Sequence, residues 1–307
     1  MSLLDSFAHI VRENENLAPY TRLNIGGNAE YFVEPTNQDE LIGVVKLCHE
    51  NKLPIRLIGS GSNLLVSDKG VSGVVLHLAA PAFGLIEVTD KGLIAGGGAK
   101  LSQFVSTAVR EGFAGPEQMV GLPGTIGGAL HSSIAAHGVD FGGWVQSAEV
   151  LTRTGEIEQR TAESMSFSYR QSSLNELVIL RATFGFEKES AAELTKAMQK
   201  LWITRRANQV ESDLRSAYIF QDVAGEFATD ILEQAGVAEM SVGKVSLAEH
   251  DLNFLVTEPG ADSSQVLELI EQVKQEVHDK TGIELQTAIC LWSVSYTHLT
   301  LPTILLV

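Results

Sequence analysis

The sequence predicts an α+β protein, in which short strands and helices are mixed along the 307 residues. Three observations support this class. Apolar runs of strand length alternate with segments of helical periodicity. Two glycine-rich turns, at 59–63 and 121–129, interrupt the first two thirds of the chain. A polar segment at 204–209 then precedes a stretch with its own helices and strands, which indicates a further domain.

The predicted elements follow from capping and periodicity. Thr36 or Asn37 caps the first helix, with Asp39 and Glu40 in its first turn. Further helices are predicted at 100–112, 189–208, 226–235 and 263–280. Strands are predicted at 53–58, 74–78, 85–97, 146–152, 156–159, 178–187 and 252–256, and two more within 21–35, joined at Gly26-Gly27. The resulting domains are 1–188, with subdomains at about 1–80 and 81–188, and 189–293.

The composition is that of a globular protein with a buried core. Apolar residues make up 44% and charged residues 20% of the chain, both ordinary values for this class. No run of eighteen apolar residues occurs, which argues against a membrane span, and the polar N-terminus does not resemble a signal peptide. Cys48 and Cys290 form neither a disulfide framework nor a zinc site. We therefore expect a cytoplasmic protein without a bound metal.

Negative charge is concentrated in the C-terminal third. The net charge of −16 argues against non-specific binding to nucleic acid. Residues 211–293 contain sixteen acidic and only four basic residues, a net charge of −12. A diphosphate would be repelled there unless local cations compensate. Such a surface would also suit a protein partner.

The last fourteen residues are treated separately. Residues 294–307 resemble one reading frame of a transposase adapter that is common in sequencing libraries. We interpret them as an adapter-derived artefact and exclude them from the fold prediction. The alternative is a genuine apolar C-terminal strand.

The two glycine-rich turns are the main functional signal. Successive glycines let backbone N–H groups converge on one point, and such nests hold phosphate oxygens. The turn at 59–63 matches neither a Rossmann fingerprint nor a Walker loop. A single turn of this kind is more often a tight loop than a ligand site, but two in one chain favour a large ligand that carries phosphates.

The turns and their flanking residues closely resemble the UDP-N-acetylenolpyruvoylglucosamine reductase family. The resemblance covers about 15–293 and is strongest up to residue 186. Four segments carry it: Thr21-Arg22-Leu23-Asn24-Ile25-Gly26-Gly27, residues 56–68, residues 121–129, and Tyr169-Arg170 followed by Ser172.

The resemblance implies a two-subdomain FAD-binding module of the vanillyl-alcohol-oxidase type and a smaller α+β C-terminal substrate domain. The family uses FAD and NADPH to reduce UDP-N-acetylglucosamine-enolpyruvate to UDP-N-acetylmuramate for peptidoglycan precursor synthesis. The implied substrate is therefore a small-molecule nucleotide sugar. Arg170 occupies the position of the family's catalytic arginine. The implied flavin contacts are Gly59, Ser60, Gly61, Ser62, Asn63, Leu64, Gly121, Pro123, Gly124, Thr125, Gly127 and Gly128.

Several positions depart from the family pattern. Tyr218 stands where the family has its proton-donating serine, and Ala288 stands where it has a glutamate. The family's lysine and asparagine positions are Gln221 and Asp222, and its Gly-Lys/Arg pair is Thr229-Asp230. A phenol can donate a proton, but it reaches further than a serine, so Tyr218 is either a substitute donor or a packing residue.

Two hypotheses follow. In the first, the chain is a reductase of this family that acts with FAD and NADPH. In the second, it is a repurposed flavoprotein that keeps FAD and has lost the family reaction. The family resemblance favours the first, and the departures at 218, 221, 230 and 288 favour the second.

Overall fold

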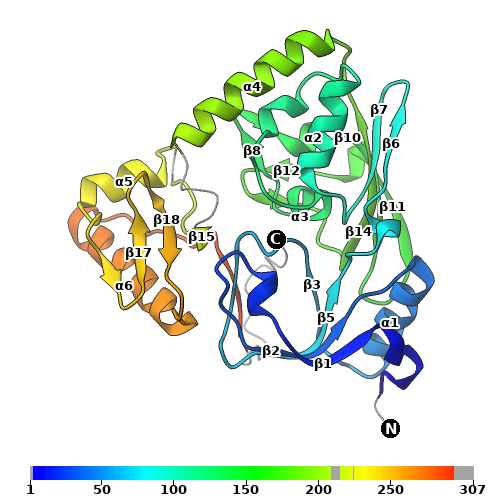
Figure 1. Cartoon of the computed structure of the whole chain (residues 1–307), viewed down its shortest axis with the longest axis horizontal. Helices are drawn as coiled ribbons and strands as arrows, with labels where there is room; N and C mark the ends of the chain where they lie inside the picture. Colours follow the sequence, from blue (N-terminus) through cyan, green and yellow to red (C-terminus); the bar gives the residue numbers. More distant parts are fainter. Residues whose placement is uncertain (1–2, 209–214, 224, 294–307) are drawn as a thin grey trace.

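A computed structural model describes residues 3–208, 215–223 and 225–293 of the chain (Figure 1). It confirms the predicted α+β class. Three larger sheets, each accompanied by helices, form the N-terminal, middle and C-terminal parts of the described structure. The predicted artefact at 294–307 lies outside the described residues.

The N-terminal sheet has the strand order β1-β2-β5-β3. Strand β1 is antiparallel to β2, whereas β2, β5 and β3 are parallel. Helix α1 (Gln38–Glu50) is capped as predicted, because the side chain of Asn37 accepts a hydrogen bond from the Glu40 amide. Its apolar face packs on the sheet through buried residues that include Leu41 and Val45. The strands are β1 (Val11–Asn16), β2 (Asn28–Val33), β3 (Ile55–Ile58) and β5 (Val71–His77).

The middle sheet is antiparallel, with the order β11-β10-β14-β7-β6. Helices α2 (Leu101–Arg110) and α3 (Ile126–His131) pack on it around Phe104, Phe141 and Phe184. Its strands are β6 (Ile86–Thr89), β7 (Gly92–Gly96), β10 (Val145–Leu151), β11 (Ile157–Thr161) and β14 (Val178–Gly185). Two short hairpins join β8 (Ala135–Ala136) to β9 (Val139–Asp140) and β12 (Phe167–Ser168) to β13 (Gln171–Ser172).

Helix α4 (Ala191–Asn208) extends from the middle unit toward the C-terminal one (Figure 1). The C-terminal sheet is antiparallel, with the order β15-β18-β17-β16, and helices α5 (Ala228–Ala235) and α6 (Ser263–Thr281) complete its core. Asp262 caps α6, and Gly282 ends it in the left-handed region. The strands are β15 (Arg215–Tyr218), β16 (Ser241–Val242), β17 (Val245–Ala248) and β18 (Asp251–Thr257).

The chain then returns to the N-terminal unit. Strand β19 (Cys290–Trp292) lies parallel to β4 (Leu64–Val66), which directly follows the first glycine-rich turn. The ring of Trp292 lies 6.0 Å from the guanidinium of Arg56, on β3. The pairing of β19 with β4 was not predicted, because nothing in two three-residue strands indicates a partner more than two hundred residues away.

The prediction of a strand at 21–25 was wrong. These residues form an irregular loop in which the Thr21 hydroxyl donates a hydrogen bond to the Ile25 carbonyl at 3.0 Å. Leu23 and Ile25 alternate as in a strand because both side chains enter the core of the C-terminal unit. The Leu23 carbonyl also accepts a hydrogen bond from Thr257 on β18. The apolar pattern therefore came from packing between units.

No helix within the described ranges is long and apolar enough to cross a membrane. Short 3₁₀ helices occupy several connections, at Asp5–Ile10, Ala18–Tyr20, Pro81–Phe83, Pro116–Met119, Phe141–Trp144 and Ala162–Ser164.

The buried side chain of Asn253 gives a first test of this fold. It accepts a hydrogen bond from the Phe220 amide at 2.8 Å and donates one to the Phe220 carbonyl at 2.9 Å, just after β15. Asn253→Ala leaves both backbone groups unpaired and should lower the free energy of unfolding by about 3 kcal/mol. Denaturant unfolding measures this, with Asn175→Ala as the exposed control, expected within about 0.5 kcal/mol of the unmodified protein. Equal stability of the two variants would contradict the role given to Asn253.

Candidate functional site

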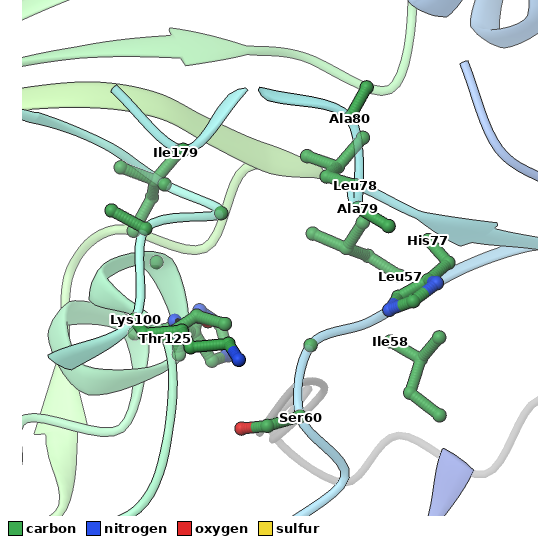
Figure 2. Close-up of a pocket in the computed structure, with 18 of the residues that line it drawn as sticks. Leu57, Ile58, Ser60, His77, Leu78, Ala79, Ala80, Lys100, Thr125 and Ile179 are labelled. Carbon is green, nitrogen blue, oxygen red and sulfur yellow. Dashed lines mark hydrogen bonds between the residues drawn. The ribbon is translucent and has the colours of Figure 1, made fainter. Parts of the chain in front are cut away.

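A cavity of about 470 Å³ lies between the N-terminal and middle units. Figure 2 shows Ser60, from the first glycine-rich turn, facing Lys100 and Thr125 across this space. The walls nearer the N-terminal sheet are largely apolar, with Leu57, Ile58, Leu78 and Ala79. The cavity therefore combines an apolar wall with hydroxyl groups and an ammonium group, which is a common composition for a cofactor site.

Close backbone contacts shape the far wall. A Cβ atom on Gly97 would lie 1.8 Å from the Ile179 carbonyl oxygen, and one on Gly127 would lie 3.1 Å from the Gly97 carbonyl oxygen. The Gly127 amide donates to that carbonyl at 2.8 Å, and the Gly128 amide donates to the Thr125 hydroxyl at 3.2 Å. These amides are thus engaged within the protein, and the second turn contributes mainly the shape of the cavity.

Two ionisable side chains in the cavity wall have defined orientations. His131 Nδ1 lies 2.7 Å from the Leu174 carbonyl oxygen, and burial lowers the pKa of this histidine. Since a carbonyl only accepts, Nδ1 carries the proton and Nε2 is left as an acceptor. Glu176 is 9% exposed and accepts a hydrogen bond from Arg160 through Oε1, whereas its buried Oε2 has no partner. A ligand donor at Oε2 would satisfy it.

Five of the twelve predicted flavin contacts line the cavity, and seven do not. Gly59, Ser60, Thr125, Gly127 and Gly128 line the cavity. The remaining seven are not among its lining residues: Gly61, Ser62, Asn63, Leu64, Gly121, Pro123 and Gly124.

Several of these seven have other contacts. Gly61, at φ +56°, lies against the Tyr20 carbonyl, and Leu64 belongs to β4 beside Cys290. Gly121, at φ +79°, lies against the side chain of Arg205 on α4. The conformational freedom of these glycines serves chain packing.

Asn63 connects the first turn to the C-terminal unit. Its Oδ1 accepts a hydrogen bond from the Tyr218 amide at 2.9 Å, and its Nδ2 donates to the Ala288 carbonyl at 3.0 Å. The Ala288 amide in turn donates to the Ile219 carbonyl at 2.7 Å. One side chain thus brings together the two segments in which the serine and glutamate positions of the resemblance lie.

Arg170 meets Tyr218 at the same junction. Arg170 lies in the turn between β12 and β13 with φ +56°, and its guanidinium lies 4.7 Å from the centre of the Tyr218 ring. Burial raises the pKa of Tyr218 well above that of a free phenol, and Arg170 acts in the opposite direction. The two predicted catalytic residues, 48 positions apart in sequence, are therefore neighbours.

Tyr169 and Asp222 extend this junction toward the surface. The Tyr169 hydroxyl donates a hydrogen bond to Asp222 Oδ2 at 2.8 Å and accepts one from the Asp222 amide at 3.2 Å. Asp222 Oδ1 accepts a further hydrogen bond from the Ala228 amide at 2.9 Å. Tyr169 is 45% exposed.

Sequence reasoning missed two polar groups of the cavity, Lys100 and Glu176. Lys100 directly precedes α2 and lies one residue beyond Gly96-Gly97-Gly98-Ala99, so its place after a glycine run was a usable signal. No local pattern distinguishes Glu176 from the other acidic residues of the chain. Within the described ranges, no cluster of three His, Cys, Asp or Glu side chains could hold a metal ion.

Comparison with known families agrees with this division into units. Residues 29–160 match the model of an FAD-binding domain. Residues 209–292 match the model described as the C-terminal domain of UDP-N-acetylenolpyruvoylglucosamine reductase. The predicted FAD-binding module with a distinct C-terminal domain is thereby confirmed.

Relatives match the chain over most of its length. The UDP-N-acetylenolpyruvoylglucosamine reductase of Rhodopirellula baltica is 36% identical over 94% of this chain and 94% of its own length, and that of Anoxybacillus flavithermus is 37% identical over 94% and 96%. The crystal structure of the reductase from Thermus caldophilus superposes with a TM-score of 0.79 at 26% identity, covering 92% of this chain and all of that one. The chain belongs to the UDP-N-acetylenolpyruvoylglucosamine reductase family.

Proposed function

We propose that this protein reduces the enolpyruvyl double bond of UDP-N-acetylglucosamine-enolpyruvate, with FAD as cofactor and NADPH as hydride donor. One observation carries the proposal: Arg170, Tyr218 and the Ala288 segment, which come from distant parts of the chain, meet beside the flavin-type cavity at Asn63. The product would be UDP-N-acetylmuramate, a precursor of peptidoglycan.

The cavity suits FAD. Its apolar wall can contact aromatic rings, and Lys100, Ser60 and Thr125 face one another where a pyrophosphate needs a cation and hydroxyl donors. The unpaired Oε2 of Glu176 can accept a hydrogen bond from an amino or hydroxyl group of the cofactor. Bound FAD would supply hydride transfer from NADPH to the substrate double bond.

The junction would bind the substrate. The guanidinium of Arg170 can hold the enolpyruvyl carboxylate and stabilise the negative charge that develops on it after hydride addition. Arg22 of the N-terminal unit adds a second cation. Its Nε donates a hydrogen bond to Ser216 Oγ, on β15 of the C-terminal unit, at 3.2 Å. Cations from outside the acidic domain thus lie where an anionic nucleotide sugar would enter.

The departures from the family pattern change residue roles. Ala288 has only a methyl side chain, so this position contributes backbone hydrogen bonds and no acid or base. Tyr218 and Arg170 remain as the proposed catalytic side chains. The relatives carry the reductase name, and neither they nor the geometry favours the repurposed flavoprotein.

We also propose a cytoplasmic location. Cys48 and Cys290 are both buried and are not joined by a disulfide, which suits a reducing compartment. A protein partner on the acidic C-terminal unit remains a proposal from its charge alone, as does the expectation that the protein does not bind nucleic acid.

The reaction can be tested in two halves with the purified full chain. We expect a yellow protein whose flavin absorbance is bleached by NADPH under anaerobic conditions. Addition of UDP-N-acetylglucosamine-enolpyruvate should then restore the absorbance with formation of one equivalent of product. Colourless protein that takes up no FAD, or reduced flavin that the substrate does not reoxidise, would refute the proposed function.

Glu176→Gln tests the cofactor site separately from turnover. Glutamine has one acceptor oxygen where glutamate has two, so it cannot accept both from Arg160 and from the cofactor. The affinity for FAD should therefore fall on the order of 10-fold. Titration of the apoprotein, followed by flavin fluorescence, measures the dissociation constant.

Glu149→Gln is the matched control for this change. Glu149 is 12% exposed and pairs with Arg181 at 3.0 Å, so the same loss of charge occurs at a comparable ion pair outside the cavity. Its affinity for FAD should equal that of the unmodified protein. An equal loss in both variants would show that Glu176 acts through general stability and does not contact the cofactor.

A further inference from the structure

The N-terminal wall of the cofactor cavity contains an imidazole ring to which the proposed function assigns no role. His77 is the last residue of β5 and lines the cavity together with Leu57 and Ile58 of β3 (Figure 2). Its side chain is 23% exposed, and Figure 2 shows the ring pointing from β5 toward the cavity. Any contact of this ring with a cofactor rests on the proposed use of FAD.

A carboxylate behind the ring determines which nitrogen faces the cavity. His77 Nδ1 lies 2.8 Å from Glu34 Oε1, and Glu34 Oε2 accepts a hydrogen bond from Arg12 at 2.8 Å. An ionised carboxylate only accepts, so Nδ1 carries a proton and donates it to Glu34. Because the charge of Glu34 is already paired with Arg12, the ring can remain neutral. The neutral tautomer leaves a lone pair on Nε2.

Two aromatic side chains hold the imidazole in this orientation. The centre of its ring lies 5.5 Å from that of Tyr20, with 73° between the ring planes, and 5.7 Å from that of Phe32. The Tyr20 hydroxyl donates to Glu15 and accepts from Arg12, both at 2.9 Å, so this support is itself fixed. The Nε2 acceptor is thereby oriented before a ligand binds, which lowers the entropic cost of binding.

The position of this wall indicates which half of FAD it meets. Hydride transfer requires the flavin ring beside the substrate, and the proposed substrate contacts meet at Asn63, where the C-terminal unit joins. From His77 the chain continues through Pro81–Phe83 to β6, on the side of the molecule away from the C-terminal unit (Figure 1). With the flavin ring directed toward Asn63, the wall around His77 is left for the adenosine half.

The chemistry of the wall also suits adenosine. The apolar side chains of Leu57, Leu78 and Ala79 can contact the faces of a purine. Adenosine carries hydrogen-bond donors on its exocyclic amino group and on its two ribose hydroxyls. A lone pair on Nε2 can accept from any of these donors, but it has nothing to offer an ionised phosphate oxygen, which also only accepts.

We propose that His77 Nε2 accepts a hydrogen bond from the adenosine half of FAD, from either the amino group or a ribose hydroxyl. Glu34 is the positioning residue, because its bond to Nδ1 keeps the proton off Nε2 and the ring in place. The contact favours the dinucleotide over flavin mononucleotide, which has no adenosine. It contributes to cofactor binding and takes no part in the hydride transfer.

The test measures the dissociation constant of FAD from the apoprotein of the full chain by flavin fluorescence. His77→Leu keeps an apolar wall but removes both nitrogen atoms, so the affinity for FAD should fall on the order of 10-fold, the cost of an unpaired ligand donor. His77→Ala should lose as much. Since His77 is partly exposed at the end of a strand, both variants should retain the thermal stability of the unmodified apoprotein.

His9→Leu is the matched control. His9 Nε2 also pairs with a glutamate, Glu40, at 3.0 Å, but neither residue lines the cavity. The same loss of an imidazole–carboxylate pair therefore occurs away from the proposed contact. The affinity of His9→Leu for FAD should equal that of the unmodified protein, and a loss equal to that of His77→Leu would refute a direct contact.

Two FAD analogues identify the donor. In one, hypoxanthine replaces adenine, so the amino group is absent; in the other, the adenosine ribose lacks both hydroxyls. The analogue without the true donor should bind the unmodified protein on the order of 10-fold more weakly than FAD, and His77→Leu should weaken it no further. With the other analogue, His77→Leu should lose as much affinity as with FAD. A full loss with both analogues would refute the hydrogen bond.

Glu34→Ala tests the positioning role. The ring can then turn, so the affinity for FAD should fall several-fold in the otherwise unmodified protein. In the His77→Leu background the same change should have no effect, because both substitutions act on one contact. Additive losses would show that Glu34 acts through the sheet and not through the imidazole.

The outcomes separate this contact from the function on which it rests. If the unmodified protein takes up neither FAD nor an analogue, the proposed function fails whatever the role of His77. If it binds FAD, but His77→Leu or His77→Ala binds FAD as tightly, the contact is refuted while the proposed function stands.

Discussion

The amide of Asn63 is the contact on which the arrangement of the site depends. It lies at the end of the first glycine-rich turn and bonds to two segments of the C-terminal unit, at Tyr218 and Ala288. The adjacent pairing of β4 with β19 adds a row of backbone hydrogen bonds along the same line. Asn63 is half-buried between the units, and a polar group that loses its partners there is costly, so this geometry favours one relative position of the two units.

A second set of hydrogen bonds, between Asp68 and Ser263, supports the same relative position of the N-terminal and C-terminal units. Asp68 Oδ2 accepts hydrogen bonds from the amide and the hydroxyl of Ser263, at 2.7 and 2.6 Å, where α6 begins. The Asp68 amide donates back to the Ser263 hydroxyl at 3.1 Å. Leu23 and Ile25 add apolar contact from the N-terminal loop. The cavity and the Arg170–Tyr218 junction are thereby held at a fixed separation, which hydride transfer between partners bound at the two places would require.

The junction also explains how family positions can change together. With tyrosine at 218, a phenol occupies the place of a small hydroxyl side chain, and its ring lies against the guanidinium of Arg170. With aspartate at 222, Tyr169 gains a carboxylate partner in place of a carboxamide. The two departures, which look like independent losses in the sequence, contact the neighbouring residues Arg170 and Tyr169 of one turn.

The sequence by itself determined the class of the fold, most of its helices and the two turns. Helix caps such as Asn37 and period-2 apolar strands such as 178–187 are local signals, and local physical chemistry sets them. The motifs also identified the family, the cofactor and the position of Arg170. Only the tertiary structure decided which groups meet: the partner strands β4 and β19, the unpaired oxygen of Glu176, and the contact of Arg170 with Tyr218. These depend on pairings between distant segments, which no local pattern encodes, and the misassigned strand at 21–25 shows the same limit, since its alternation reflects burial in another unit.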